Sequence, residues 1–246
     1  MNPRSILVAS TMVVLLACGA CTSSHGAPRS DSDAIPPSQI LDFSVLYGQN
    51  CAGCHGTDGK GGAALALANP VFLAIADDIV IRSIAANGVP GTPMPAFAQS
   101  AGGMLTDKQI DALVVGIRSW AKPDPFRDTT LPPYAAEAPG DPRRGADSYQ
   151  TFCSSCHGVD GRGGSKASSI VDGSYLALVS DQELRTIVIA GRPEQGAPDW
   201  RSDVEGRPMS EREITDVVAW LAAKRLAIPG QPYPNSSLNQ STGGVQ

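Results

Sequence analysis

The sequence contains one short motif twice, as Cys51-Ala52-Gly53-Cys54-His55 and as Cys153-Ser154-Ser155-Cys156-His157. Two cysteines three positions apart, followed directly by a histidine, form the attachment signature of c-type haem. Each thiol can add to one haem vinyl group, and the histidine can then ligate the iron from its proximal side. The repetition therefore predicts two covalently bound haem c groups.

Within each motif, the cysteines and the histidine have different predicted roles. The haem is attached covalently through Cys51 and Cys54 in the first copy, and through Cys153 and Cys156 in the second. The proximal iron ligands are His55 and His157.

Closely spaced cysteines also occur in zinc ribbons and in thioredoxin-like redox sites. A zinc site would need a second cysteine pair for each ion, and a redox dithiol would need a β-α-β context. Neither reading explains a histidine after the second cysteine in both copies. Haem attachment is the preferred interpretation, with a structural metal or a disulfide as the alternatives.

The amino-terminal segment has the form of an export signal. Arg4 precedes an apolar run at residues 6–17, which is too short to span a bilayer and is typical of a signal-peptide core. Its end, Leu15-Leu16-Ala17-Cys18, resembles the lipobox of bacterial lipoproteins. We predict a signal peptide at residues 1–18 and a lipid anchor on Cys18, on the periplasmic side of a bacterial membrane. The alternatives are lipidation of Cys21 and ordinary cleavage after Ala20.

Aligning the two motifs shows that the chain is a duplication. Cys51 matches Cys153, Gly88 matches Gly191, and residues 105–110 match residues 209–214. Two domains are therefore expected, at residues 41–122 and 143–227. A Pro-rich linker at 123–142 should be extended and semi-rigid. Flexible segments are expected at 19–40 and 228–246.

The pattern within each copy predicts an all-α fold. Residues 44–50 and 147–152 should form helices that lead into the motifs and offer aromatic side chains to the porphyrin. Middle helices are expected at 79–86 and 184–190. Thr106 with Gln109, and Ser210 with Glu213, form capping boxes before the last helices. These last helices carry matching apolar stripes and should cross the leading helices: Ile110, Leu113, Val114 and Ile117; Ile214, Val217, Val218 and Leu221.

With these motifs and helices, each copy resembles a class I cytochrome c domain, and the pair is similar in layout to dihaem cytochromes of the c4 type. The resemblance covers both predicted domains. It implies a small helical fold around a haem with one exposed edge, used to pass single electrons.

The resemblance also implies a methionine as the sixth iron ligand, in a loop between the middle and last helices. The first copy provides Met94 in Gly91-Thr92-Pro93-Met94-Pro95. A thioether favours ferrous iron, raises the reduction potential and closes the iron to substrates.

The second copy departs from this pattern, because Ala197 stands at the aligned position. Either the second iron is five-coordinate or water-bound, or Met209 ligates it. Met209 aligns with Leu105, which is a packing position.

Two further features concern the surroundings of the haem groups. It assigns the hydrogen-bond acceptor of the proximal histidine to a proline carbonyl, which Pro70 fits in the first copy and Gly173 replaces in the second. An arginine near a haem edge can pair with a propionate, and the candidates are Arg82, Arg185 and Arg192; the alternative is that these arginines are solvated, as exposed helix arginines more often are.

Composition limits the function. The formal net charge is −5 and no basic stripe is present, which argues against nucleic-acid binding. Acidic electron carriers dock on basic patches of redox partners or membrane complexes. We therefore predict a non-enzymatic, membrane-tethered electron carrier, which is either independent or a subunit of a larger redox complex. The alternative is a haem enzyme or gas sensor that uses an open second iron, for example in peroxide reduction.

Overall fold

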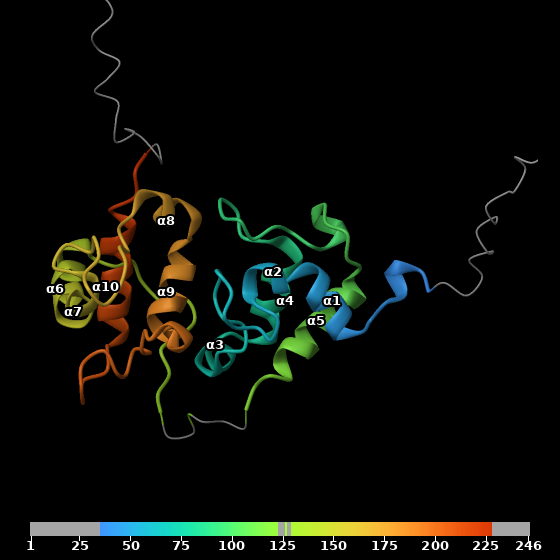
Figure 1. Ribbon diagram of the computed structural model, residues 1–246, viewed down its shortest axis with the longest axis horizontal. Helices are drawn as coiled ribbons and strands as arrows, with labels where there is room; N and C mark the ends of the chain where they lie inside the picture. Colours follow the sequence, from blue (N-terminus) through green and yellow to red (C-terminus); the bar gives the residue numbers. More distant parts are fainter. Residues whose placement is uncertain (1–34, 123–125, 127–128, 228–246) are drawn as a thin grey trace, which may run out of the picture. The chain divides into compact units, whose positions relative to one another are not determined.

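The computed structural model describes residues 35–122, 126 and 129–227 (Figure 1). Every regular element in this part of the chain is a helix, and the only β structure there is a few isolated bridges. This confirms the predicted all-α class. The predicted signal peptide, the lipid anchor Cys18 and the carboxyl-terminal tail lie outside the described residues. The chain divides into two compact units, Met1–Gln39 and Ile40–Gln246.

The short 3-10 helix η2 (Pro37–Gln39) belongs to the first unit, and the second unit holds the two repeats. Each repeat has the same order of five α-helices. The first contains α1 (Phe43–Asn50), α2 (Ala52–His55), α3 (Pro70–Ile75), α4 (Asp78–Asn87) and α5 (Asp107–Arg118), with η3 (Gln99–Ala101) before α5. The second contains α6 (Pro142–Phe152), α7 (Ser154–His157), α8 (Gly173–Leu178), α9 (Asp181–Ala190) and α10 (Glu211–Ala222), with η4 (Pro193–Gln195) before α10.

None of the helices among the described residues is long and apolar enough to cross a membrane.

Side-chain caps explain where most helices begin. Both predicted capping boxes are present, at Thr106 for α5 and at Ser210 for α10. The helix α6 begins earlier than the predicted residue 147, because Asp141 accepts a hydrogen bond from Arg143 N at 2.8 Å and Pro142 fits the first helical turn. The helices α3 and α8 were not predicted. They are capped by Asn69 and Asp172.

The leading and last helices of each repeat are in contact, as predicted, and a glycine lies at each contact. A Cβ atom built on Gly116 of α5 would overlap the ring of Phe43 on α1. In the second repeat the glycine is on the other helix: a Cβ on Gly145 of α6 would overlap the Asp216 carbonyl and press on Trp220 of α10. A glycine therefore allows the two helices to approach closely in both repeats. It lies on the last helix in the first repeat and on the leading helix in the second.

Aromatic side chains fill these helix contacts. Trp120 packs edge-on against Phe43 and Tyr47, with ring centroids 5.3 and 5.0 Å apart. Trp220 stacks on Tyr149 at 4.3 Å. The hydroxyl groups of Tyr47 and Tyr149 donate to the carbonyls of Gly56 and Gly158, which immediately follow the motifs. These aromatic residues thus hold the motif loops on the helices that cross.

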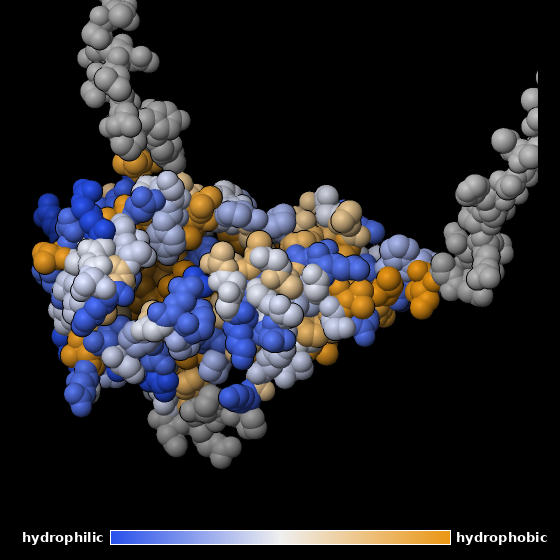
Figure 2. All heavy atoms as spheres, in the orientation of Figure 1, coloured by the Kyte–Doolittle hydropathy of each residue, from blue (hydrophilic) through white to orange (hydrophobic). Residues whose placement is uncertain are grey.

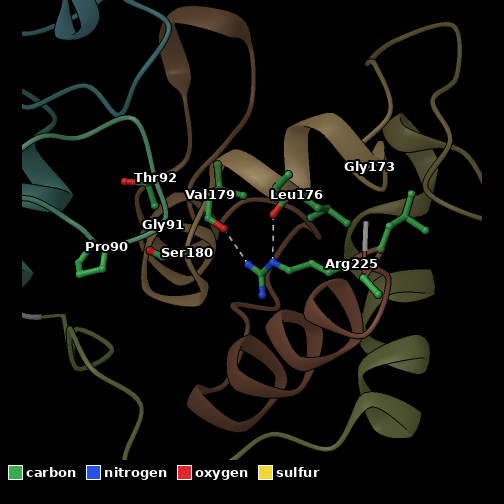
Figure 3. Close-up of a pocket in the computed structure, with 11 residues that line it drawn as sticks. Pro90, Gly91, Thr92, Gly173, Leu176, Val179, Ser180 and Arg225 are labelled. Atoms are coloured by element: carbon green, nitrogen blue, oxygen red, sulfur yellow. Dashed lines mark hydrogen bonds between the residues drawn. The ribbon is translucent and has the colours of Figure 1, made fainter. Parts of the chain in front are cut away.

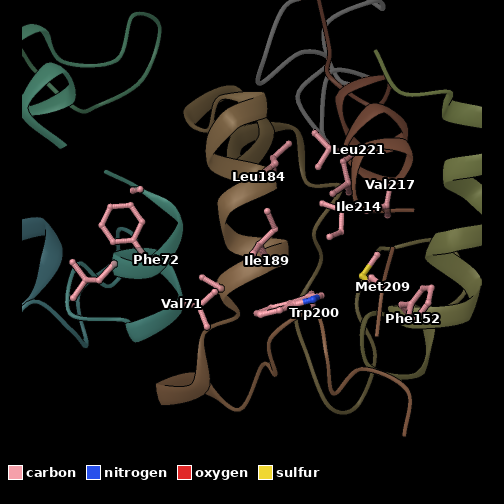
Figure 4. Packing of buried hydrophobic residues seen from close by; sticks show 14 of the residues in the cluster. Val71, Phe72, Phe152, Leu184, Ile189, Trp200, Met209, Ile214, Val217 and Leu221 are labelled. Atoms are coloured by element: carbon pink, nitrogen blue, oxygen red, sulfur yellow. The ribbon is translucent and has the colours of Figure 1, made fainter. Parts of the chain in front are cut away.

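The buried core extends across the repeats within Ile40–Gln246. Val71 and Phe72 of α3 belong to the same hydrophobic cluster as Ile189 of α9 (Figure 4). Asn69, which is 5% exposed, donates from Nδ2 to the Ala190 carbonyl at 3.0 Å. On the face drawn in Figure 2, an apolar floor lies in a hollow over α9 and α10.

The described part of the linker before α6 contains no helix and contacts the second repeat. Arg185 of α9 is 2% exposed, and it donates to the backbone carbonyls of Pro133 (2.8 Å) and Tyr134 (3.0 Å). A buried guanidinium is stable only when its donors are satisfied, so these bonds tie the linker to α9.

Candidate haem-attachment sites

Each motif is wound into a single helical turn. In the first repeat, the backbone N–H groups of Cys54 and His55 donate to the Cys51 carbonyl at 3.2 and 3.0 Å. In the second repeat, those of Cys156 and His157 donate to the Cys153 carbonyl at the same two distances. Residues three and four apart share one side of a helix. The turn therefore presents both thiols and the histidine of each motif on one side.

A glycine ends each turn and lets the chain fold back. Gly56 (φ 83°) and Gly158 (φ 79°) are in the left-handed region, which favours glycine. A Cβ built on Gly62 would overlap the Cys54 carbonyl, so the following loop lies directly against the motif. Ala64 N–H donates to this Cys54 carbonyl at 3.0 Å.

The two histidine rings are held in the same way. Nδ1 of His55 lies 2.8 Å from the Leu65 carbonyl oxygen, and Nδ1 of His157 lies 2.8 Å from that of Ser168. A carbonyl only accepts, so Nδ1 carries the proton and Nε2 keeps its lone pair for a metal. Burial lowers the pKa of His55, although the bond to Leu65 acts in the opposite direction. The neutral ring is the form that ligates iron.

These acceptors correct the prediction made for Pro70. Pro70 begins α3 and does not accept from His55, because the loop after the motif brings the Leu65 carbonyl to the ring first. The second histidine is held at the same distance, despite Gly173 at the position aligned with Pro70. Backbone acceptors have no residue signature, so the sequence could not identify them.

The four motif cysteines form no disulfide; Cys54 is exposed, and Cys51, Cys153 and Cys156 are half-buried. Burial, and then the neighbouring Cys54, raise the pKa of Cys51 to about 11. Burial, followed by Asp203 and Cys156, raises that of Cys153 to about 12. Redox-active dithiols need a lowered pKa, so the environment does not favour that reading. Among the described residues, no group of three or more His, Cys, Asp and Glu side chains could hold a metal ion. Two thiols beside a free Nε2 fit a covalently attached haem.

Residues 88–98, the loop that follows α4 and contains Met94, are called the first distal loop. This loop is fixed on the end of α4. Val89 N–H donates to the Met94 carbonyl at 3.0 Å, and Thr92 Oγ1 accepts from Met94 N at 3.2 Å. Gly88 (φ 67°) begins this loop, and a Cβ there would overlap the backbone at residues 94–96. Met94 is half-buried. Its ligation to the first iron stays a prediction.

The loop that follows α9, residues 191–200, is the second distal loop, and its backbone follows the same path as the first. Arg192 N–H donates to the Ala197 carbonyl at 3.0 Å, as Val89 does to Met94. Gly191 (φ 64°) begins the loop, and a Cβ there would overlap the Pro198 carbonyl. Met209 N–H donates to the Trp200 carbonyl at 2.8 Å, which corresponds to the 2.7 Å bond from Leu105 to Phe97. The backbone pairing thus places Ala197 at the position of Met94, and Met209 at that of Leu105.

The family model described as cytochrome c oxidase, cbb3-type, subunit III matches residues 38–115 and 140–221. The two matches together cover more than half of the chain, and each contains one Cys-x-x-Cys-His motif. The chain belongs to the cbb3-type subunit III family. It is a c-type cytochrome with two tandem cytochrome c domains, and its redox function depends on haem c.

Among solved structures, a chain of the reducing HAO-like protein complex of Kuenenia stuttgartiensis is similar to this cytochrome. The identity is 20%, the TM-score is 0.42, and the match covers 78% of this chain and 99% of that chain. No curated protein sequence matches significantly.

The arginines of the cytochrome that were expected near haem propionates all bind protein groups. Arg82 pairs with Asp107 (2.9 Å) and Asp111 (2.7 Å) on α5. Arg185 donates to the linker carbonyls and pairs with Glu211. Arg192 donates to the carbonyls of Gly62 (2.8 Å), Ala63 (3.2 Å) and Ala64 (3.3 Å) in the loop after the first motif. In this structure these guanidinium groups therefore join protein segments, and propionate pairing stays a hypothesis.

One acid near the second motif was missed by the sequence analysis. Asp203 is half-buried between the distal loop and α10, and its charge contributes to the raised pKa of Cys153. Burial, and then the charge of Asp199, raise the pKa of Asp203 to about 7. A carboxyl group that is partly protonated near neutral pH therefore lies close to the second attachment site. Asp203 lies far from the motif in the sequence, so no sequence pattern linked the two.

A separate cavity of about 320 Å³ lies beside the segment that precedes Met94 (Figure 3). Pro90, Gly91 and Thr92 line one side, and α8 with Arg225 lines the other. Arg225 donates to the carbonyls of Leu176 (3.0 Å) and Val179 (2.8 Å), shown as dashed lines. Its charge is thus directed at the backbone of α8 and its carboxyl-terminal end, rather than at the cavity.

Proposed function

We propose that the chain carries two haem c groups, one on each repeat, and passes single electrons between redox proteins outside the bacterial cytoplasm. The observation that carries this proposal is the matched geometry of the motifs. Each is wound into one turn, and the histidine of each donates from Nδ1 to a backbone carbonyl at 2.8 Å. When bound, haem supplies a one-electron iron couple. The chain holds the imidazole rings and orients Nε2.

The first distal loop supports electron transfer rather than substrate chemistry. Hydrogen bonds within this loop, from Val89 N to the Met94 carbonyl and from Met94 N to Thr92 Oγ1, hold Met94 in a turn. In this proposal the Met94 sulfur is the sixth ligand of the first iron. A thioether raises the reduction potential and closes the iron to substrates.

The cytochrome works beside a membrane in this proposal. Cys18 carries the lipid, and residues 19–40 form the tether to the first repeat. The name of the matching family supports a place in a cytochrome c oxidase complex. The net charge of −5 favours docking on basic patches of redox partners, since complementary charge steers weak encounters.

A haem enzyme is the second candidate. Ala197 favours it, because alanine has no donor atom where the first repeat has Met94. Asp203 adds an acid close to Cys153. His55 and His157 are the only histidines among the described residues, and both belong to the motifs. Electron transfer is therefore the better-supported function.

Isolation from native membranes tests the proposal. We expect a tagged chain to carry two haems by pyridine haemochrome assay and to co-purify with subunits of a membrane redox complex. A chain with no covalent haem, or one recovered alone from the soluble fraction, would contradict it.

A further inference from the structure

The second distal loop has the backbone of a methionine-bearing loop without its methionine. The bond from Arg192 N to the Ala197 carbonyl equals the bond from Val89 N to the Met94 carbonyl, at 3.0 Å. Both loops begin at a left-handed glycine that lies against the same part of the turn. The chain path is thus conserved between the repeats, and a methyl group replaces the thioether.

Met209 occupies a different place. It is 3% exposed, and the equivalent Leu105 is 6% exposed. Its side chain lies in one hydrophobic cluster with Phe152 and Trp200 (Figure 4). Methionine commonly fills irregular gaps in a core, and its backbone is already fixed to Trp200. Ligation by Met209 would require this packing to open.

The charged side chains of the loop are engaged in ion pairs. Glu194 pairs with Arg192 at 3.2 Å, and Asp199 pairs with Arg201 at 2.6 Å. The clamp from Arg192 to the carbonyls of Gly62, Ala63 and Ala64 further fixes the start of the loop. No histidine lies in this loop. The loop therefore offers neither a sulfur nor an imidazole donor.

We propose that the second haem binds an uncharged diatomic ligand at the distal position that Ala197 leaves free. This inference rests on the proposed function, because it requires a haem on Cys153, Cys156 and His157. Arg192 and Arg201 are already paired with Glu194 and Asp199, so neither is left to neutralise an anion, and a neutral molecule such as carbon monoxide is favoured.

Carbon monoxide binding to the reduced, haem-loaded full chain is the test. We expect one of the two haems of the wild-type protein to bind carbon monoxide. The same haem should be high-spin before carbon monoxide is added. Ala197→Met should abolish this binding and convert the site to low-spin. Met209→Leu is the matched control and should bind carbon monoxide as the wild type does.

The outcomes separate the inference from the proposed function. Two low-spin haems and no carbon monoxide binding in the wild type would overturn the inference and leave electron transfer intact. Binding that appears only in Met209→Leu would show that Met209 is the ligand, and would also overturn it. A haemochrome assay that shows fewer than two haems per chain would instead overturn the proposed function.

Discussion

At the scale of single residues, the two repeats share a proximal side and differ on the distal side. The carbonyls of Leu65 and Ser168 hold the histidines at equal distances. On the distal side, one position differs between Met94 and Ala197 while the backbone bonds stay the same. Such a difference is readable from sequence, whereas the carbonyl acceptors are not, because any residue can supply one.

The role of Met94 leads to a prediction. Met94→Ala should lower the reduction potential of one haem, because the thioether no longer stabilises ferrous iron. Each tenfold loss of this preference lowers a one-electron potential by about 59 mV. A spectroelectrochemical titration measures the shift. Met104→Ala is the control, since Met104 is 82% exposed and should leave both potentials unchanged. Equal potentials in wild type and Met94→Ala would show that Met94 only packs.

At the scale of helices, the capping boxes were easier to predict from the sequence than the contacts between helices. The capping boxes at Thr106 and Ser210 are local patterns, and both were predicted correctly. The helices α3 and α8 are short, so they show little apolar periodicity, and their caps at Asn69 and Asp172 were overlooked. The exchange of large and small residues between Phe43 with Gly116 and Gly145 with Trp220 depends on which helix faces lie together. A sequence pattern does not specify that arrangement.

The contact between α1 and α5 gives the second prediction. Gly116→Ala should destabilise the protein by about 1–3 kcal/mol, because the new methyl group overlaps the Phe43 ring. Denaturant unfolding of the haem-loaded protein measures this. Gly48→Ala in α1 is the control: a Cβ there meets nothing within 4 Å, so its stability should stay equal or rise by about 1 kcal/mol.

A double variant identifies the cause. Phe43→Ala combined with Gly116→Ala should lose less stability than the sum of the two single variants, since the overlap disappears with the ring. Strict additivity would contradict the predicted steric conflict.

At the scale of the whole molecule, the repeats are joined by buried polar contacts as well as by the linker. Asn69 and Arg192 connect the loop after the first motif with the end of α9 and the second distal loop. The contacts of Arg192 could not be predicted from the sequence, because residues 62–64 offer only backbone carbonyls and leave no pattern to detect. The linker was expected to be a spacer, whereas its described part also binds Arg185.

Removal of the Arg192 clamp is the third prediction. Arg192→Gln should lower the free energy of unfolding by about 1–3 kcal/mol, because three backbone carbonyls, two of them in half-buried residues, lose a charged donor. The haem content should not change. Arg162→Gln is the matched control, since the Arg162 side chain is 80% exposed and pairs with Asp160 on the surface. Equal unfolding midpoints for the two variants would contradict the role of the clamp.

The membrane anchor is the fourth prediction. Mass spectrometry of the mature amino terminus should find a lipid on Cys18, and Cys18→Ala should release the protein from membranes. An unmodified terminus that begins after Ala20 would exclude this anchor.

The central claim is that each repeat carries one covalent haem and cycles by one electron. Spectroelectrochemical titration tests it most directly, on the wild type and on two variants, Cys51→Ala with Cys54→Ala and Cys153→Ala with Cys156→Ala. We expect two one-electron steps of equal amplitude in the wild type, and one remaining step in each variant. A wild type without covalent haem, or a single pair of substitutions that removes both steps, would contradict the account.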